Sequence, residues 1–309
     1  MTWSVVEMAR RACSHVLTSI ICSKETPNHV GFIMDGNRRY AHSLGIDAMG
    51  GHSEGYRVLL DCLQWCLELQ VSVVSVYAFS IDNYNRSEKE VAALMDLAHR
   101  KLLELCREAE SLEQRGVRIQ ILGDLCLAPK QVQEAAQQIM TATHHNSRCT
   151  LNICFSYTSS AELVRATRLC SGVATEQTQG CSHIDDYLYT ADCPPIDLLI
   201  RTSGECRLSD FMLRQSHCCI LHFTPKLWPD FSFLDLLEAI IEYQRHFDEL
   251  QYARVSLEGA KHRSLIHQRH ASLARFASRC RCKEEEFHSP SSVITPEDTS
   301  SVDSPRCIE

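Results

Sequence analysis

The 309-residue sequence contains no long apolar run and no excess of basic residues, and each absence excludes a class of protein. No segment approaches the roughly 18 consecutive apolar residues of a membrane-spanning helix, so we expect none. The 31 lysines and arginines are outnumbered by 39 aspartates and glutamates. The net charge of -8 argues against a general nucleic-acid-binding protein with a basic face, so local arginine clusters should bind a small anion.

The sequence also lacks the cysteine spacing of a zinc module, although it contains 17 cysteines. Cys62 and Cys66 lie one helical turn apart, and Cys218 and Cys219 are adjacent. No cleavable signal peptide is evident. We therefore expect reduced thiols in an intracellular protein.

The hydrophobic content of 44% is sufficient for one large α/β domain, which we place at residues 27–250. An amphipathic helix is expected at 1–26, and its apolar stripe with basic flanks suits either a membrane surface or packing on its own domain. A helical extension is expected at 251–282. The acidic segment 283–309, which is rich in serine and proline, is predicted to be disordered.

Six short apolar runs alternate with segments of helical periodicity. This alternation predicts an α/β fold with a single open, mostly parallel six-stranded sheet flanked by helices. The strands are expected at 30–34, 73–79, 117–122, 150–155, 196–200 and 220–223. The helices are expected at 51–69, 87–115, 129–144, 161–169 and about 233–277. The helix at 87–115 should begin with a capping box formed by Ser87 and Glu90.

Polar residues follow the first predicted strand immediately. They are Asp35, Gly36, Asn37, Arg38 and Arg39. In an open α/β sheet, ligands bind beyond the carboxyl ends of the strands, and a turn into a helix offers N–H groups to phosphate. Asp35 could hold Mg2+, which leaves coordination positions for substrate phosphates, while the arginines clamp an oligophosphate. A helix N-cap aspartate followed by a solvated arginine pair would produce the same pattern.

A second anion-binding pattern follows the fifth predicted strand. Arg201 and Arg207 flank a turn in which Thr202 and Ser203 precede Gly204. Guanidinium groups, hydroxyls and a glycine turn could form a nest for another anion. A polar surface loop would have a similar composition.

These motifs, taken together, resemble those of the cis-prenyltransferases, the family of undecaprenyl diphosphate synthase and its eukaryotic relative dehydrodolichyl diphosphate synthase. The resemblance covers roughly residues 27–245. It is carried by residues 29–40, Gly51-His52, 77–86, 197–209 and Leu227-Trp228-Pro229. Residues 32–40, 201–205 and 208–211 look closer to the eukaryotic catalytic subunit than to the bacterial enzymes.

The resemblance implies an enzyme that adds isopentenyl diphosphate units to farnesyl diphosphate with Z geometry and builds the product in an apolar tunnel. Asp35 would hold Mg2+ and assist departure of the allylic diphosphate. Asn37 would orient groups during proton loss, or serve as a structural amide of the turn. The residues around the allylic diphosphate would be Gly36, Asn37, Arg38, Arg39 and His52. Those holding isopentenyl diphosphate would be Arg86, Arg201, Arg207 and Ser209.

The sequence departs from the family pattern at four positions. Ala48 replaces a common arginine, Asp82 replaces glutamate, and Arg214 replaces tryptophan. Ile220 stands where bacterial members have a metal-binding glutamate. At Ala48 one contact to the allylic diphosphate would be missing.

The chain also lacks the C-terminal Arg-x-Gly motif of the family. In eukaryotic members this motif comes from a second subunit resembling the Nogo-B receptor, so the resemblance implies a heteromer. It further implies a peripheral location on the cytoplasmic face of the endoplasmic reticulum membrane, and a product, dehydrodolichyl diphosphate, used for dolichol synthesis and protein glycosylation.

Two other functions fit parts of the sequence. The first is a weakly active or non-catalytic family member that serves as an interaction subunit, which the departures at Ala48 and Arg214 suggest. The second is a Mg2+-dependent phosphohydrolase that uses Asp35. An aspartyl-phosphate mechanism would require a second carboxylate two residues later, where the sequence has Asn37.

Overall fold

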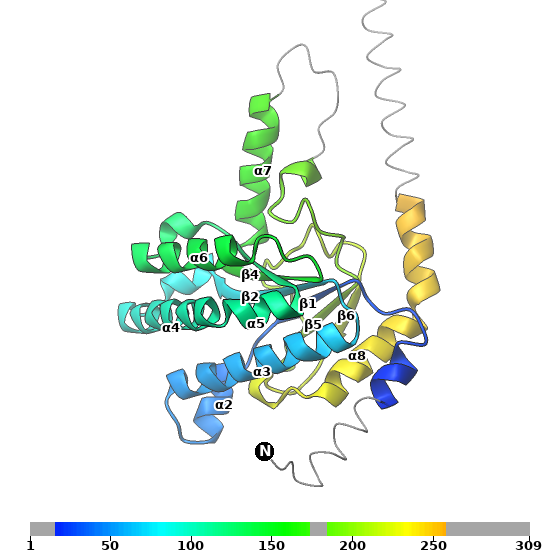
Figure 1. The fold of residues 1–309 in the computed structure, drawn as a ribbon, viewed down its shortest axis with the longest axis horizontal. Helices are drawn as coiled ribbons and strands as arrows, with labels where there is room; N and C mark the ends of the chain where they lie inside the picture. The colour runs from blue at the N-terminus through cyan, green and yellow to red at the C-terminus, as the bar shows by residue number, and fades with distance from the viewer. Residues whose placement is uncertain (1–15, 174–183, 258–309) are drawn as a thin grey trace, which may run out of the picture. The chain divides into compact units, whose positions relative to one another are not determined.

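A six-stranded, entirely parallel sheet forms the centre of the unit that ends at Arg254, as the alternation of strands and helices predicts (Figure 1). In the computed structural model, which describes residues 16–173 and 184–257, the strand order is β3-β4-β2-β1-β5-β6. The strands are β1 His29–Ile33, β2 Val73–Ser80, β3 Val117–Leu122, β4 Cys149–Tyr157, β5 Leu198–Arg201 and β6 Ile220–Phe223. All six predicted strands are present, and the described residues up to Arg254 belong to one unit.

Helices connect the strands, and two of the predicted helices are interrupted. The α-helices are α2 Asn37–Ser43, α3 Ala48–Glu68, α4 Glu88–Arg107, α5 Ala109–Arg115, α6 Lys130–Thr143, α7 Ser159–Val173 and α8 Phe233–Arg245. The single helix predicted at 87–115 is wrong, because the chain turns at Glu108 and α5 packs on β3 and α6. The helix predicted from 233 breaks at a turn at His246 and resumes over 247–257. Its predicted continuation to 277 lies outside the described residues.

The N-terminal segment can be followed from residue 16, and its helix ends at residue 21. Ile21 is buried in the core, and the side-chain amide of Gln244 in α8 donates to the carbonyl oxygens of Ile21 and Glu25 at 2.9 and 3.0 Å. This part of the predicted amphipathic helix therefore packs on its own domain. No helix within the described ranges combines the length and apolarity that crossing a bilayer requires.

Both faces of the sheet are buried, which explains why its strands are continuous apolar runs. On β1, Val30 and Phe32 point into the larger core, together with side chains of α3, α4, α6 and α8. Ile33 points to the opposite face, where it packs with Leu199 and Phe211. The sheet is thus a rigid support for the loops at the two ends of its strands.

Buried polar side chains hold the amino ends of the central strands. The imidazole of His29 is fully buried, with Nδ1 2.8 Å from the carbonyl oxygen of Pro194 and Nε2 2.7 Å from the hydroxyl of Ser75. Asn152 of β4 donates to the same hydroxyl at 3.1 Å. Burial lowers the pKa of His29 to about 4, so this histidine is neutral at physiological pH.

A buried ion pair fixes the start of β5 against the start of β1. The carboxylate of Asp197 accepts hydrogen bonds from the backbone N–H groups of Asn28 and His29 at 2.7 and 3.0 Å. Its other oxygen lies 2.6 Å from the guanidinium of Arg254. Strands β1 and β5, which precede the predicted anion-binding motifs, are therefore held in register at their amino ends, opposite the motifs.

The buried histidine predicts that the protein loses stability in mild acid. The unfolded chain takes up a proton on His29 at its ordinary pKa of 6.5, but the folded protein resists protonation until about pH 4. This stabilising contribution is complete above pH 6.5, and up to about 3 kcal/mol of it is lost as the pH falls to 4. Urea unfolding across this range should show a shallower pH dependence for His29→Gln than for the wild type. The exposed His144→Gln is the control, and equal slopes for both variants would contradict the prediction.

Candidate active site

The two predicted anion-binding motifs lie side by side at the carboxyl edge of the sheet. The chain leaves β1 for β2 on one side and later reaches β5 on the other side, so a switch point lies between β1 and β5. Ile33 at the end of β1 pairs with Arg201 at the end of β5. This is the place where open α/β sheets bind ligands.

An ion pair joins the two motifs. The Oδ2 atom of Asp35 accepts a hydrogen bond of 2.9 Å from Arg201, whose side chain is only 4% exposed. A second nitrogen of Arg201 donates to the Ser209 hydroxyl at 2.8 Å and to the backbone oxygen of Arg207. Burial alone would raise the pKa of Asp35, but hydrogen bonding and the Arg201 and Arg39 charges outweigh it and lower the pKa. Asp35 is therefore an ionised carboxylate at neutral pH.

The backbone of Asp35 is fixed by contacts that the sequence does not reveal. Its N–H donates to the Thr202 hydroxyl at 3.0 Å, and the same hydroxyl donates to the Asp35 carbonyl oxygen at 2.7 Å. The backbone N–H of Trp228, in a 3-10 turn at Trp228–Asp230, also donates to that oxygen at 3.0 Å. Sequence reasoning identified Asp35 but missed the role of Thr202.

Asn37 occupies a tight space between α2 and α3. Its side-chain nitrogen donates to the Met34 carbonyl at 3.3 Å, and its Oδ1 atom is buried without a partner among the described residues. A Cβ atom at Gly55 would lie 2.2 Å from this oxygen. The indole of Trp228 holds the same turn of α3 by donating to the Gly55 carbonyl at 2.7 Å. Gly55 thus allows the amide of Asn37 to lie against α3.

Arg38 and Arg86 form one basic cluster, which we name clamp A. The Oε1 atom of Glu90 in α4 bridges them, 2.9 Å from Arg86 and 3.7 Å from Arg38. His52 of α3 lines the same cavity as both arginines, and burial together with the charges of Arg86 and Arg38 lowers its pKa. Clamp A therefore combines two cations with a histidine that is predominantly neutral at pH 7.

Arg39 and Arg207 form a second cluster, clamp B. Glu205 bridges them, with an ion pair to Arg207 and a contact of 3.9 Å to Arg39. Arg39 also donates to the backbone oxygen of Ser203 at 3.1 Å and lies 3.7 Å from Asp35. The two adjacent arginines of α2 thus diverge into different clusters.

The loop that carries Ser209 is held in an unusual backbone conformation. Ser209, Asp210 and Met212 all have φ between 44° and 58°, the left-handed region that non-glycine residues rarely adopt. The Asp210 carbonyl and carboxylate accept from the N–H groups of Ser159 and Ser160 at the start of α7. This cap of α7 compensates for the strain and places the Ser209 hydroxyl on Arg201. Strained loops of this kind are concentrated at functional sites.

All ten predicted site residues line one cavity of about 990 Å³. Part of its wall is apolar, and α4 contributes Leu94, Leu97, Leu102 and Leu105 to that part. No three His, Cys, Asp or Glu side chains in the described part of the chain cluster in a way that could hold a metal. A metal ion at Asp35 would therefore need oxygen ligands from the substrate, as Mg2+ often has. The tunnel implied by the resemblance stays a prediction.

The structure places all four departures from the family pattern. Asp82 lies in the 3-10 helix Ile81–Asn85 and lines the cavity. Ala48 is exposed at the first turn of α3, four residues before His52 and on the same side of the helix. Arg214 donates two hydrogen bonds, of 2.6 and 2.7 Å, to the Asp185 carboxylate, which accounts for an arginine at that position. Ile220 begins β6 and pairs with Leu198 at the start of β5. Within this chain it therefore lies at the amino ends of the strands, whereas Asp35 lies beyond their carboxyl ends.

The fold and site together define a class of enzyme. Five arginines around the ionised carboxylate of Asp35 suit a substrate with phosphate groups, and the apolar part of the wall suits a hydrocarbon chain. The sequence model of undecaprenyl diphosphate synthases matches residues 33–250, more than half of the chain. The chain belongs to this family, the cis-prenyltransferases, and is a transferase.

Relatives and solved structures agree with this classification. The chain is 46% identical over 242 residues to a dehydrodolichyl diphosphate synthase complex subunit of Homo sapiens, covering 76% of this chain and 72% of that protein. It is 39% identical to a complex subunit of the same name from Schizosaccharomyces pombe, with 71% and 86% of the two chains covered. The crystal structure of lavandulyl diphosphate synthase from Lavandula x intermedia superposes with a TM-score of 0.66 at 30% identity, covering 71% of this chain and 95% of that one.

The contact between Gly55 and Asn37 generates a testable prediction. In Gly55→Ala the added methyl group would collide with the Asn37 amide and the Trp228 ring. Overpacking of this kind costs about 1–3 kcal/mol of unfolding free energy, and displacement of Asn37 should reduce prenyl transfer about tenfold or more. Urea unfolding and turnover measure the two effects. Gly50→Ala in the same helix is the control, since its methyl group would meet no atom closer than 3.1 Å. Equal effects of the two substitutions would contradict the prediction.

Proposed function

We propose that this chain is the catalytic subunit of a dehydrodolichyl diphosphate synthase, which condenses isopentenyl diphosphate units with farnesyl diphosphate. The observation that carries the proposal is the 2.9 Å contact between Asp35 and Arg201, because it brings the two anion-binding motifs to one cavity. Two diphosphates bound there would have their carbon chains close enough to react.

The residues around Asp35 fit a single magnesium ion. The carboxylate is ionised, 34% exposed and faces the cavity, so it can supply one ligand while phosphate oxygens supply others. When bound, the ion would neutralise negative charge on the departing diphosphate. Arg201 keeps the carboxylate oriented through its hydrogen bond, and Thr202 fixes the backbone on which it stands.

The two clamps suit the two diphosphates. Clamp A, with His52 and the N–H groups at the start of α2, would hold the allylic diphosphate, whose leaving group gains charge as the carbon–oxygen bond breaks. Clamp B, with Arg201 and Ser209, would hold isopentenyl diphosphate. Arg86 is thereby assigned to the allylic side, because Glu90 joins it to Arg38, whereas the family resemblance would place it with Arg201.

The apolar wall of the cavity would receive the growing hydrocarbon chain. Leucines from α4 and aromatic rings of Phe79 and Phe155 line it. These side chains exclude water from the allylic carbocation, which water would otherwise quench. Positioning and electrostatics suffice for this reaction, so no covalent nucleophile is required.

A partner subunit and a membrane location belong to the same proposal. The relatives from Homo sapiens and Schizosaccharomyces pombe are named as subunits of a complex, which supports a heteromer. We infer that the partner resembles the Nogo-B receptor and supplies the missing Arg-x-Gly motif. The enzyme would then act at the cytoplasmic face of the endoplasmic reticulum membrane, where its product enters dolichol synthesis and protein glycosylation.

The two alternatives are less well supported by the site. An interaction subunit without activity would not need all ten site residues around one cavity. A phosphohydrolase would need a second carboxylate near Asp35, but the side chain two residues later is the Asn37 amide. The apolar wall also has no purpose in hydrolysis of simple phosphate esters.

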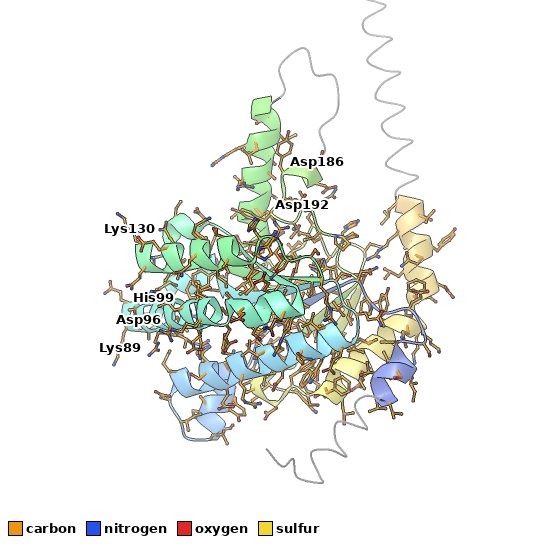
Figure 2. The ribbon with its side chains drawn as sticks, viewed as in Figure 1. Lys89, Asp96, His99, Lys130, Asp186 and Asp192 are labelled. Atoms are coloured by element: carbon orange, nitrogen blue, oxygen red, sulfur yellow. The ribbon has the colours of Figure 1, made fainter. Side chains whose placement is uncertain are left out.

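Replacement of Asp35 tests the proposed reaction. Asp35→Ala should reduce incorporation of radiolabelled isopentenyl diphosphate into farnesyl-primed products by about 10²-fold or more at saturating Mg2+, because charge on the leaving group is no longer neutralised. The assay uses the full chain, alone and with its accessory subunit, and chromatography of the products. Asp96→Ala is the control, since Asp96 is exposed on α4 (Figure 2) and does not line the cavity. Retention of most activity by Asp35→Ala would argue against the proposed metal role.

Restoring the family arginine at position 48 separates the enzyme from the interaction subunit. Ala48→Arg would place a cation one helical turn before His52, and one charge-assisted contact should lower the KM for farnesyl diphosphate about tenfold. Ser53→Arg adds the same charge on another face of α3 and should leave KM nearly unchanged. If the wild-type chain with its partner makes no product and only Ala48→Arg does, the natural chain is not the catalytic subunit.

A further inference from the structure

Clamp A contains a carboxylate at a place where the proposed function requires affinity for anions. Glu90 contacts both arginines through the same Oε1 atom, and its side chain is 30% exposed. A negative charge next to a diphosphate site opposes binding, so the position of Glu90 needs an explanation beyond substrate recognition.

Helix capping does not explain where this carboxylate lies. The sequence predicts a capping box between Ser87 and Glu90, but the structure forms only half of it. The Ser87 hydroxyl accepts from the Glu90 N–H at 3.3 Å, and the Glu90 carboxylate turns to Arg86 instead of the Ser87 backbone. Elsewhere the chain completes two such boxes, at Ser80 and at Ser232.

The bridge stabilises the empty clamp. Two guanidinium groups on either side of a diphosphate site repel each other when the site contains no anion. The Glu90 carboxylate compensates part of this charge and gives both arginines a partner, so they keep a defined position before substrate arrives. The same charge repels an anion that enters and so lowers its affinity.

We propose that Glu90 is the counterion of clamp A: its carboxylate holds Arg38 and Arg86 in place and promotes release of the pyrophosphate that each condensation leaves behind. The inference rests on the proposed function, because pyrophosphate must leave this site before the elongated chain can bind there again. Glu90 acts through the arginines and is a positioning residue.

The companion glutamate in clamp B is less suited to a test. Glu205 bridges Arg39 and Arg207, but Arg39 also lies 3.7 Å from the proposed magnesium ligand Asp35. A substitution of Glu205 would therefore disturb the metal ligand and the clamp together. Among the described residues Glu90 contacts Arg38 and Arg86 but not Asp35, so its replacement changes clamp A alone.

Calorimetric titration with inorganic pyrophosphate, in buffer without divalent cations, measures the effect directly. Glu90→Gln keeps the size of the side chain and a hydrogen-bond acceptor but removes the charge. The full-length variant should bind pyrophosphate about fivefold to tenfold more tightly than the wild type. Glu88→Gln is the matched control, because Glu88 lies in the same first turn of α4 and is exposed. Its affinity should equal that of the wild type.

Further measurements separate charge from shape. Glu90→Asp retains the charge and should bind pyrophosphate within about twofold of the wild type. Raising the salt concentration should reduce the difference between Glu90→Gln and the wild type, since screening weakens charge effects. In steady state, Glu90→Gln should lower both the KM for farnesyl diphosphate and kcat, and strengthen product inhibition by pyrophosphate. A purely structural loss would instead raise KM.

The outcomes distinguish this inference from the proposed function. If the wild type binds pyrophosphate and the Gln variants at 88 and 90 bind it equally, the counterion role is wrong and the anion site stands. Weaker binding by Glu90→Gln, or equal changes in the Gln and Asp variants at 90, would also overturn it. If the wild type binds no pyrophosphate, the anion site itself and the proposed function both fail.

Discussion

The ion pair between Asp35 and Arg201 is the contact on which the site depends. Arg201 is nearly inaccessible to solvent, so its charge requires partners, and it finds them in Asp35, Ser209 and the backbone of Arg207. One guanidinium thus joins the end of β1 to the loop after β5. Because parallel neighbouring strands end at the same edge, the sheet brings these groups together without help from the more distant loops.

Much of the fold and the main site residues could be predicted from the sequence. Strands buried on both faces are continuous apolar runs, which the sequence shows directly, and the polar residues that follow them indicate the functional end of the sheet. Asp35 and Arg201 stand at such strand ends. The break at Glu108 left no comparable signal, because the residues around it favour a helix and only packing of α5 on β3 and α6 bends the chain.

The residues that sequence reasoning missed act through contacts between distant segments. Thr202 binds the backbone of Asp35, and the Trp228 indole reaches Gly55 across 173 residues. In the sequence Gly55 is an ordinary helix residue, and its close contact with the Asn37 amide is evident only from the structure. The sequence predicts Glu90 as half of a capping box, and its arginine partners are revealed only when α2 and α4 are placed together. Local patterns identify groups that face the site but not those that position them.

The charge arrangement suits repeated turnover better than tight binding. Each clamp has two arginines and one glutamate, so its net charge is smaller than the arginines alone would give. An enzyme that elongates a chain must release pyrophosphate in every cycle, and affinity shared equally by the substrate and the leaving product slows that release. Moderate binding in the ground state, with stronger interactions as charge develops on the leaving group, allows both steps. Glutamates within an anion-binding site are therefore consistent with proposed catalysis by successive condensations.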